Sequence, residues 1–430
     1  MLMQRNLSSL AGNARWISSL RVQLFVEILL GILLPFVARY GFHANYDRHP
    51  SAGASFALSL ASVVSAMLLS RRIGGFPGTR TFIYVLPTFS MCFGVAMMAA
   101  LVLRLDYNRT VLLASFTLSV AVAYALAYLG ARGAVRRFHV VPGGRTRFLD
   151  DIEGAEWVQM AQPTVPTGRE VMIVADLHHD LESAWERMLA QAAINGVPVY
   201  HVKQIRELLT GRVQIEHLSE NSFGSLMPNL AYRKFKRLID LGASLLVLPV
   251  LIVTMGLIAL SIRLDSRGPV FFRQQRMGYR GRPFTMVKFR TMVPRSDDMD
   301  KDARRASAIT RADDDRVTRI GRFLRRTRLD ELPQILNILA GDMSWIGPRP
   351  EAMDLSTWYE AEIPFYSYRH IVRPGITGWA QVNQGHVADL AEINMKLQYD
   401  FFYVKNFSAW LDVLITMRTV VVMLSGFGSK

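Results

Sequence analysis

Cysteine is nearly absent from this sequence of 430 residues. The single cysteine, Cys92, excludes a disulfide within the chain and a zinc site built from several thiolates. A cleavage site of small residues is also lacking after the apolar runs near the N-terminus. We therefore do not expect any of these apolar runs to be a signal peptide that is removed.

Acidic residues are also few, since 35 Asp or Glu stand against 50 Lys or Arg and leave a formal net charge of +15. Half of the residues are hydrophobic, and the mean hydropathy is +0.18. This apolar content excludes disorder over most of the length. The most basic segment has few aromatic side chains to stack on bases, so we expect no nucleic-acid partner. The composition instead predicts a membrane protein that presents cations to lipid headgroups or phosphorylated substrates.

Four apolar runs of about the length of a membrane helix occupy the first part of the chain. Arginines are concentrated before the first run, between the second and third, and after the fourth, which places both ends of this unit in the cytoplasm. We therefore expect a bundle of four transmembrane helices in residues 1–134. The runs are Val22–Phe42, Ala54–Ser70, Phe82–Leu103 and Val111–Gly130.

Residues 135–228 are expected to form a soluble, cytoplasmic, Rossmann-like α/β module. Strand-like and helix-like stretches alternate there in a βαβ pattern. The first strand leads into Pro142-Gly143-Gly144-Arg145, not into the Gly-x-Gly-x-x-Gly turn that binds dinucleotides, so we interpret the module as a spacer or dimerisation unit. The expected strands are Arg137–Val141, Glu170–Val174 and Val197–Val202, and the expected helix is Asp180–Ile194.

Two adjacent histidines, His178 and His179, precede Asp180. A zinc site would need a third and a fourth ligand at suitable spacing, which this stretch does not supply. Asp180 is therefore expected to cap the N-terminus of the following helix.

A fifth apolar run, Leu241–Ile262, has Pro249 near its middle. It is long enough to cross a bilayer as a straight helix. A crossing would, however, place the most basic part of the chain outside the cell, against the charge rule. Because proline removes a backbone hydrogen bond and bends a helix, we expect a re-entrant helix over residues 236–264 that turns at Pro249 and returns to the cytoplasmic side.

The segment Arg263–Asp330 holds 19 Lys or Arg against 9 Asp, a net charge of +10. A surface that binds headgroups would explain this excess, and so would a pocket for a substrate with several phosphates. Asp330 and Glu331 follow three arginines, and Pro333 suits the first turn of the apolar helix Ile335–Leu339. The arginines and the helix N-terminus are expected to attract an anion and to keep both carboxylates ionised.

Several motifs in this order resemble those of the bacterial sugar transferases, the monotopic-type polyprenyl-phosphate phosphoglycosyl transferases that begin surface-polysaccharide assembly. The resemblance covers Tyr232 to the C-terminus, and the preceding membrane helices and α/β module resemble those of the large members, such as undecaprenyl-phosphate glucose or galactose phosphotransferases. Small members begin near the re-entrant helix. The motifs are Lys288–Met292, Leu329–Gln334, Gly341–Pro350, Val372–Asn383 and Tyr403–Asn406.

The resemblance implies a fold, a reaction and a place. An α-rich catalytic domain over residues 229–430 would face the cytoplasm at the bacterial inner membrane, in contact with its lipids and paired as a homodimer. It would transfer a hexose-1-phosphate from a UDP-sugar to undecaprenyl phosphate and release UMP. This transfer would be the first membrane step of exopolysaccharide, capsule or O-antigen synthesis.

The resemblance also implies roles for single residues. Asp330 would be the nucleophile that forms a covalent phosphosugar intermediate, and Glu331 its partner, the two of them holding Mg²⁺ or, in its place, Mn²⁺. Pro249 would be the break in the re-entrant helix. Phosphate groups would be bound by Lys288, Arg325 and Arg349, and by Arg373 from the turn Arg373-Pro374-Gly375. Pocket candidates are Trp379, Gln381, Asn383 and Asp400, the last without an assigned role.

Other interpretations remain open at this point. A membrane scaffold could use the basic segment only to bind lipid. A glycosyltransferase with a D-x-D metal site would release UDP, and Asp298-Met299-Asp300, Asp300-Lys301-Asp302 and Asp313-Asp314-Asp315 are candidates for that site. Trp345 could line a pocket or belong to the core. The C-terminal stretch Tyr399–Leu424 could be an interfacial amphipathic helix or a buried core helix.

Overall fold

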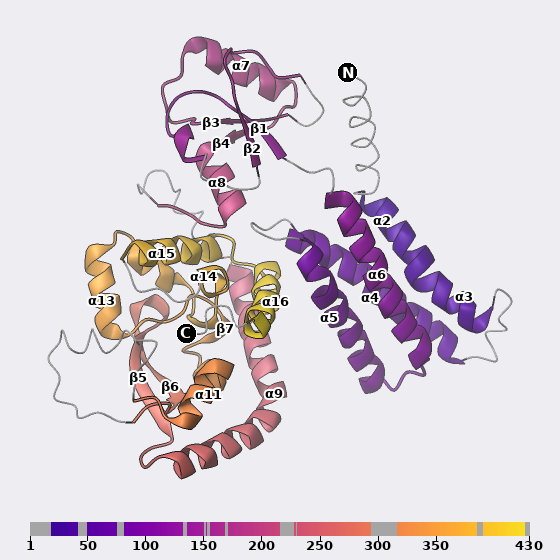
Figure 1. The fold of residues 1–430 in the computed structure, drawn as a ribbon, viewed down its shortest axis with the longest axis vertical. Coiled ribbons are helices and arrows are strands. Elements are labelled where there is room, and N and C mark those ends of the chain that lie inside the picture. The colour runs from indigo at the N-terminus through magenta and orange to yellow at the C-terminus, as the bar shows by residue number, and fades with distance from the viewer. Residues whose placement is uncertain are drawn as a thin grey trace. The chain divides into compact units, whose positions relative to one another are not determined.

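A computed structural model of the chain separates it into two compact units, Met1–Gly211 and Arg212–Lys430 (Figure 1). We describe each unit by itself. The residues described are 19–41, 50–74, 81–131, 136–149, 152, 155–167, 171–215, 228, 230–293, 316–384 and 390–425. The three D-x-D candidates lie outside these residues.

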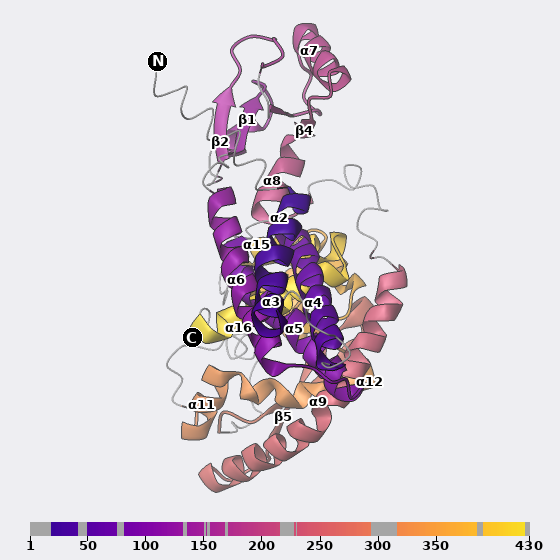
Figure 2. The ribbon, with the colours of Figure 1, turned by 90° about the vertical axis from the view of Figure 1, so that its right-hand side faces the viewer.

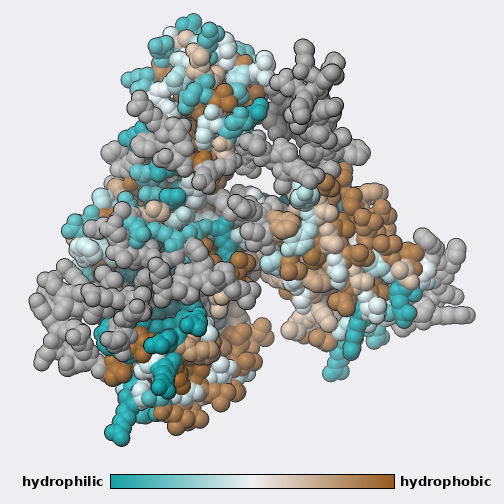
Figure 3. Space-filling view, viewed as in Figure 1, coloured by the Kyte–Doolittle hydropathy of each residue, from teal (hydrophilic) through white to brown (hydrophobic). Residues whose placement is uncertain are grey.

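Four helical segments, each long and apolar enough to cross a membrane, begin the first unit. Buried side chains from all four share one core, among them Ile32, Val63, Phe89 and Ala123. Hydrophobic residues also cover the outside of these helices, as expected for a surface that faces lipid (Figure 3). The segments are Leu20–Tyr40, composed of α2 (Leu20–Val26), the π-helical η1 (Glu27–Leu33) and α3 (Leu34–Tyr40), then α4 (Pro50–Gly74), α5 (Thr81–Val102) and α6 (Arg109–Ala131).

Glu27 lies within the first of these apolar segments, where a carboxylate is unusual. Its side chain is fully buried and therefore does not face lipid. Gly31, one turn further on, allows η1 to approach α6 closely, because an added Cβ would lie 2.1 Å from Ser119 Oγ. Gly31 thus lets α6 lie close to the position of the buried Glu27.

A parallel four-stranded sheet with the order β2-β1-β3-β4 follows the apolar helices in sequence. The predicted βαβ unit is present as β3, α7 and β4, while β2 and α8 were not foreseen. Helix α7 packs Trp185 and Met188 against one side of the sheet, and α8 packs Ile205 against the other. The elements are β1 (Arg136–Val140), η3 (Thr146–Leu149), β2 (Ala155–Gln159), β3 (Met172–Ala175), α7 (Ser183–Ile194), β4 (Val199–His201) and α8 (Val202–Thr210).

The second unit begins with one 36-residue helix, α9 (Leu230–Asp265), which contains Pro249 and bends along its length (Figures 1 and 2). In the limb before Pro249, Ser244 accepts a hydrogen bond from Trp345 Nε1 at 3.1 Å. Near its end, Ile258 and Ile262 pack with Leu324. The two limbs of α9 thus contact the same unit, while side chains between them are exposed, Val250 by 69%.

Short strands and helices build the rest of the second unit. The hairpin of β5 and β6 is antiparallel, and β7 and β8 form a parallel pair. The elements are β5 (Phe271–Met277), η5 (Tyr279–Gly281), β6 (Pro283–Phe289), α11 (Arg319–Thr327), η6 (Leu329–Gln334), α12 (Ile335–Ala340), β7 (Ser344–Ile346), α13 (Met353–Glu362), η7 (Tyr366–Ile371), β8 (Gly375–Thr377), α14 (Trp379–Gln384), α15 (Leu390–Lys405) and α16 (Ala409–Ser425).

The two last helices contribute to the core of this unit. Tyr403 on α15 is buried, and its hydroxyl donates a hydrogen bond to Asp412 Oδ1 on α16 at 2.8 Å. Lys236 Nζ from α9 lies 2.5 Å from Asp412 Oδ2, so α9 contacts the same carboxylate. Leu411, Leu414 and Ile415 are fully buried. One face of α16 therefore belongs to the core, while Trp410, Val420 and Met423 on the same helix are exposed.

Candidate active site

Asp330 and Glu331 stand directly after a sharp reversal between two helices. Arg328 takes the left-handed conformation (φ 60°), which ends α11 and starts the short helix η6. The apolar side chains of Ile335 and Ile338 then anchor α12 in the core. Both carboxylates are thereby held in a mostly buried position, 9% and 6% exposed, at the predicted start of a helical run.

Glu331 is surrounded by cations from three separate elements. Arg349 Nη2 lies 2.7 Å and Lys288 Nζ 3.1 Å from its Oε1 atom, and Arg328 Nη1 lies 3.9 Å away. Burial opposes ionisation of Glu331, but Arg349 and Lys288 outweigh it and hold the pKa of this carboxyl well below its usual value. Glu331 is therefore an ionised, fixed group that positions the cations around it.

Asp330 is in a different state from its neighbour. Among the described residues, no hydrogen bond or ion pair engages its carboxylate. Burial raises its pKa, against the opposing effect of Lys288, Arg349 and Arg325. The cations therefore outweigh the effect of burial at Glu331, whereas burial outweighs the effect of the cations at Asp330. A carboxylate that is buried among cations but not hydrogen-bonded to them is available to react with phosphorus.

The pH dependence of activity follows from this difference. A nucleophilic Asp330 would have to be ionised, so the acid limb of kcat/KM would then lie above the ordinary aspartate pKa of about 3.9. Because Arg325 lowers the pKa of Asp330, the variant Arg325→Gln is expected to shift this limb to higher pH. A pH profile of product release measures it, with the exposed neighbour Arg326→Gln as the control. A limb that stays in place in Arg325→Gln would contradict the electrostatic role of Arg325.

Arg349 is held in place from behind by a buried ion pair. Arg369 Nη2 donates a hydrogen bond to the main-chain oxygen of Arg349 at 2.8 Å and lies 2.8 Å from Asp400 Oδ2. Tyr366 accepts from Arg369 Nη1 at 2.7 Å. Asp400, which had no assigned role, thus neutralises the arginine that fixes the loop carrying Arg349.

Glycine is required in the same loop because two backbones touch there. A Cβ at Gly347 would lie 2.3 Å from the main-chain oxygen of Arg373, and one at Gly378 would lie 2.2 Å from that of Gly347. This close approach lets β7 and β8 bring the Gly341–Pro350 motif beside the Val372–Asn383 motif. The two motifs therefore form one structure around Arg349.

Not all of the predicted phosphate ligands meet at this place. Arg325 Nε donates to Thr291 Oγ1 at 2.9 Å and acts electrostatically on Asp330. Arg373 contacts other groups, because its Nε donates to the main-chain oxygen of Gly341 at 2.9 Å and its guanidinium covers the Tyr279 ring. Lys288 and Arg349 are the two predicted cations that contact Glu331.

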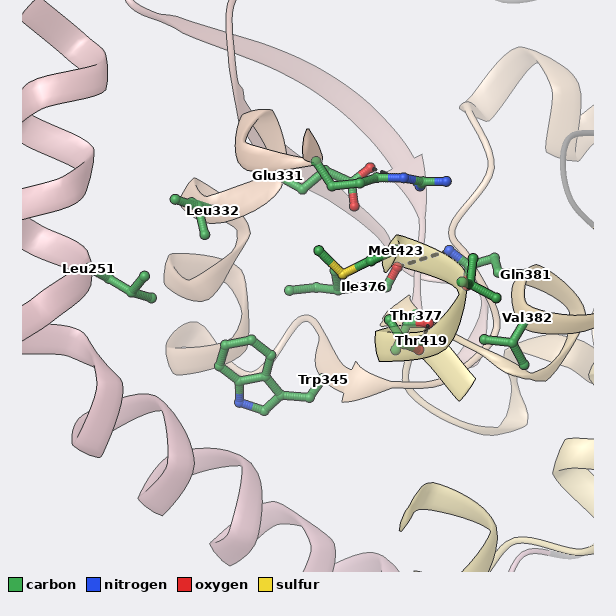
Figure 4. A pocket seen from close by; sticks show the side chains of 12 residues that line it. Leu251, Glu331, Leu332, Trp345, Ile376, Thr377, Gln381, Val382, Thr419 and Met423 are labelled. Carbon is green, nitrogen blue, oxygen red and sulfur yellow. Dashed lines mark hydrogen bonds and ion pairs between the residues drawn. The ribbon is translucent and has the colours of Figure 1, made fainter. Parts of the chain in front are cut away.

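An apolar pocket extends from Glu331 towards Leu251 on α9 (Figure 4). Gln381 lines it, as predicted, and so does Trp345. Trp379 does not, since it is 1% exposed and stacks on Phe402 in the core. The further lining residues are Arg328, Leu332, Ile376, Thr377, Val382, Thr419, Val422 and Met423.

Asn383 contacts α16 instead of lining this pocket. Its side-chain oxygen accepts a hydrogen bond from Arg418 Nη1, and the Arg418 guanidinium also lies 4.6 Å from the centre of the Trp379 ring. Asn383 and Trp379 therefore join the Val372–Asn383 motif to the last helix.

The carboxylate pair suits a divalent cation. Carboxylate oxygens are hard donors of the kind that Mg²⁺ and Mn²⁺ bind. Both oxygens of Glu331 already accept hydrogen bonds from Arg349, whereas the oxygens of Asp330 have no such donor among the described residues. Asp330 thus fits a metal better than Glu331 does.

The α/β module brings two histidines together. The sequence pointed to His178 but not to its partner His201. His178 Nδ1 lies 2.7 Å from His201 Nε2, which lies 3.4 Å from Asp176 Oδ1. The backbone N–H of Lys203 donates to His201 Nδ1, so neutral His201 carries its proton on Nε2. A metal in this cluster would have to bind that same Nε2 atom, which argues against a metal site here. Asp180 is not the cap of α7, since that helix begins after Glu182.

The fold and the site together define a membrane protein with a carboxylate pair among cations beside an apolar pocket. Residues 231–426 match the family described as bacterial sugar transferase, and the chain belongs to this family, as its motifs predicted. It is an enzyme of the phosphotransferase class and has the architecture of the large members.

Three relatives show the extent of the similarity. The chain is 40% identical over 411 residues, 94% of its length, to the UDP-N-acetylgalactosamine-undecaprenyl-phosphate N-acetylgalactosaminephosphotransferase of Aeromonas hydrophila, of which it covers 95%. UDP-glucose:undecaprenyl-phosphate glucose-1-phosphate transferases of Xanthomonas campestris pv. campestris and Caulobacter vibrioides are 47% and 41% identical over 39% and 47% of this chain. These two alignments cover 34% and 74% of the relatives.

Proposed function

We propose that the enzyme transfers a sugar-1-phosphate from a UDP-sugar to undecaprenyl phosphate and releases UMP. The observation that carries this proposal is the nearly full-length similarity to a transferase of that substrate class, joined to a buried carboxylate that is free to react. The step would begin exopolysaccharide, capsule or O-antigen assembly at the bacterial inner membrane.

The proposed chemistry proceeds in two displacements. An Asp330 oxygen attacks the phosphorus bonded to the sugar, and the bond between this phosphorus and the bridging oxygen of UMP breaks. An oxygen of undecaprenyl phosphate then attacks the same phosphorus, which restores the Asp330 carboxylate and forms a lipid diphosphate sugar. UMP leaves without protonation near neutral pH, so no histidine acid is needed.

The surrounding residues stabilise charge rather than move protons. Lys288 and Arg349, held by Glu331, lie where phosphoryl oxygens gain charge in the transition state. A bound Mg²⁺ or Mn²⁺, held by Asp330 with Glu331 beside it, would supply further neutralisation of those oxygens. The apolar pocket between Glu331 and Leu251 offers a place for the first isoprene units of the acceptor.

The nucleotide product tests the proposal. The purified enzyme, incubated with undecaprenyl phosphate and Mg²⁺, is expected to release UMP from one of UDP-N-acetylgalactosamine, UDP-glucose and UDP-galactose. The relatives act on N-acetylgalactosamine or glucose by name, so the panel also identifies the sugar. UDP as the sole product would support a D-x-D glycosyltransferase and refute the proposed reaction.

The bent α9 supports a re-entrant topology, with the catalytic unit on the cytoplasmic side. Both limbs contact the same unit, so a straight crossing would have to pull one of them away. In a Cys92→Ser background, Arg273→Cys on β5 is expected to react with an impermeant maleimide only from the cytoplasmic side. The control Asp106→Cys, in the loop after α5, is expected to react from the periplasmic side. Periplasmic labelling of Arg273→Cys would refute the re-entrant form.

A further inference from the structure

A second group of cations lies at the start of α9. Arg233, Lys234 and Arg237 from this helix, Arg280 from η5 and Arg373 line one hollow together with Tyr279. We call it the cationic hollow. Among the described residues, no carboxylate forms an ion pair with any of these five cations. This differs from the catalytic site, where Glu331 neutralises its neighbours.

Neutral acceptors fix the cations of this hollow in place. Arg237 donates to the main-chain oxygens of Ile338 and Leu339 at 2.5 and 3.0 Å, and Arg373 donates to that of Gly341 at 2.9 Å. These three carbonyls lie at the C-terminal end of α12. Asp330 and Glu331 precede the N-terminal end of the same helix, so the two sites use opposite ends of it.

Tyr279 organises the remaining arginines. Its hydroxyl accepts a hydrogen bond from Arg233 Nη1 at 3.0 Å, and the guanidinium groups of Arg280 and Arg373 lie 5.1 and 5.3 Å from the centre of its ring. Burial, followed by the nearby Arg237, lowers the pKa of Arg373. Asp240 acts on Arg373 only at a distance, and no ion pair with a carboxylate is present among the described residues, so a bound anion would stabilise these like charges.

The position of the hollow on α9 indicates which anion it takes. Exposed apolar side chains, among them Phe235 and Leu238, share the first turns of this helix with the cations. α9 is also apolar enough over its length to enter a membrane. Basic residues beside a membrane helix lie at the level of the lipid headgroups. We propose that the cationic hollow binds the phosphate group of an anionic phospholipid, at a site separate from the catalytic one.

Native mass spectrometry of the full-length enzyme in detergent tests the proposal, with dioleoyl phosphatidylglycerol and dioleoyl phosphatidylcholine as probes. Both lipids carry a phosphate, but the choline cation is repelled by the hollow. In the double variant Arg233→Gln/Arg280→Gln, the preference for phosphatidylglycerol is expected to fall by roughly tenfold, as for the loss of charge-assisted hydrogen bonds. The charge-conserving variant Arg233→Lys/Arg280→Lys is expected to retain most of it.

The matched control removes the same charge from the other end of α9. Arg263 and Arg267 are exposed there, and Arg263→Gln/Arg267→Gln is expected to keep the lipid preference. An equal loss in this control, or no loss in Arg233→Gln/Arg280→Gln, would overturn the proposal. A competition experiment can also overturn it. If glycerol phosphate displaces the bound lipid at the same concentration as a short-chain phosphatidylglycerol, the hollow binds soluble phosphate and not a lipid. An unchanged thermal unfolding profile shows that each variant is folded, and none of these outcomes depends on catalysis.

Discussion

Replacing Asp330 with asparagine is expected to abolish UMP release, with a loss of about a thousandfold or more. The amide has nearly the same size and leaves the cations around Glu331 in place, but it cannot form an acyl phosphate. The measurement is the rate of UMP release from the preferred UDP-sugar in the presence of undecaprenyl phosphate. A variant with nearly normal UMP release would remove Asp330 from the role of nucleophile.

A second measurement separates attack by Asp330 from a role in binding. Without the lipid acceptor, a UDP-sugar labelled in the sugar-linked phosphate is expected to label the wild-type protein covalently and to leave Asp330→Asn unlabelled. The control is Asp354→Asn, because Asp354 is an exposed carboxylate on α13 and is expected to behave like the wild type. Label on Asp330→Asn would place the intermediate on another residue.

The apolar helices are the part of the fold that the sequence predicts most directly. The run Val22–Phe42 corresponds to the helix Leu20–Tyr40, and the run Val111–Gly130 lies within Arg109–Ala131. A membrane helix needs a long uninterrupted apolar stretch, so its signal is spread over some twenty residues. Pro249 is similar, because a single proline identifies the place where a helix can bend.

Short elements held by tertiary contacts were missed. Strand β2 (Ala155–Gln159) has only five residues, among them Glu156 and Gln159. Polar and apolar residues do not alternate clearly over so short a stretch. Helix α8 begins with a capping box in which the His201 side chain accepts from the chain that follows. Neither feature has the length from which a periodic pattern is recognised.

The candidate site was predicted where its chemistry is local in sequence. Asp330 and Glu331 are adjacent in sequence, and the arginines just before them indicate an anion-binding site. Arg373 and Trp379 belong to equally specific motifs, yet the directions of their side chains depend on what packs behind them. The unequal states of Asp330 and Glu331 depend on Lys288 and Arg349, which come from elements distant in the chain.

Asp400 is the case in which a motif position acquires a role only through the structure. Its carboxylate is 1% exposed and pairs with Arg369, which is 3% exposed and holds the main chain of Arg349. Because both charges are buried, Asp400 depends on Arg369 for compensation, while Arg369 is compensated chiefly by Asp400 and in part by Glu351 at 3.9 Å. The sequence shows an aspartate before a run of aromatic residues but not the arginine thirty-one positions earlier that it neutralises.

Asp400→Asn is therefore expected to destabilise the enzyme by about 3 kcal/mol, because it removes the carboxylate 2.8 Å from the buried Arg369 guanidinium and leaves only Glu351, at 3.9 Å, as its counter-charge. The midpoint of thermal unfolding in detergent is expected to fall on the order of 10 °C. The control is Glu392→Gln, which removes an exposed carboxylate from the same helix and is expected to leave the midpoint unchanged. In the double variant Arg369→Met/Asp400→Leu, which removes both charges, most of the stability is expected to return. The double variant should still release UMP more slowly than the wild type, since Arg349 has lost the donor that fixes its main chain. A fully active double variant would mean that the ion pair serves stability alone and that the loop holds Arg349 without it.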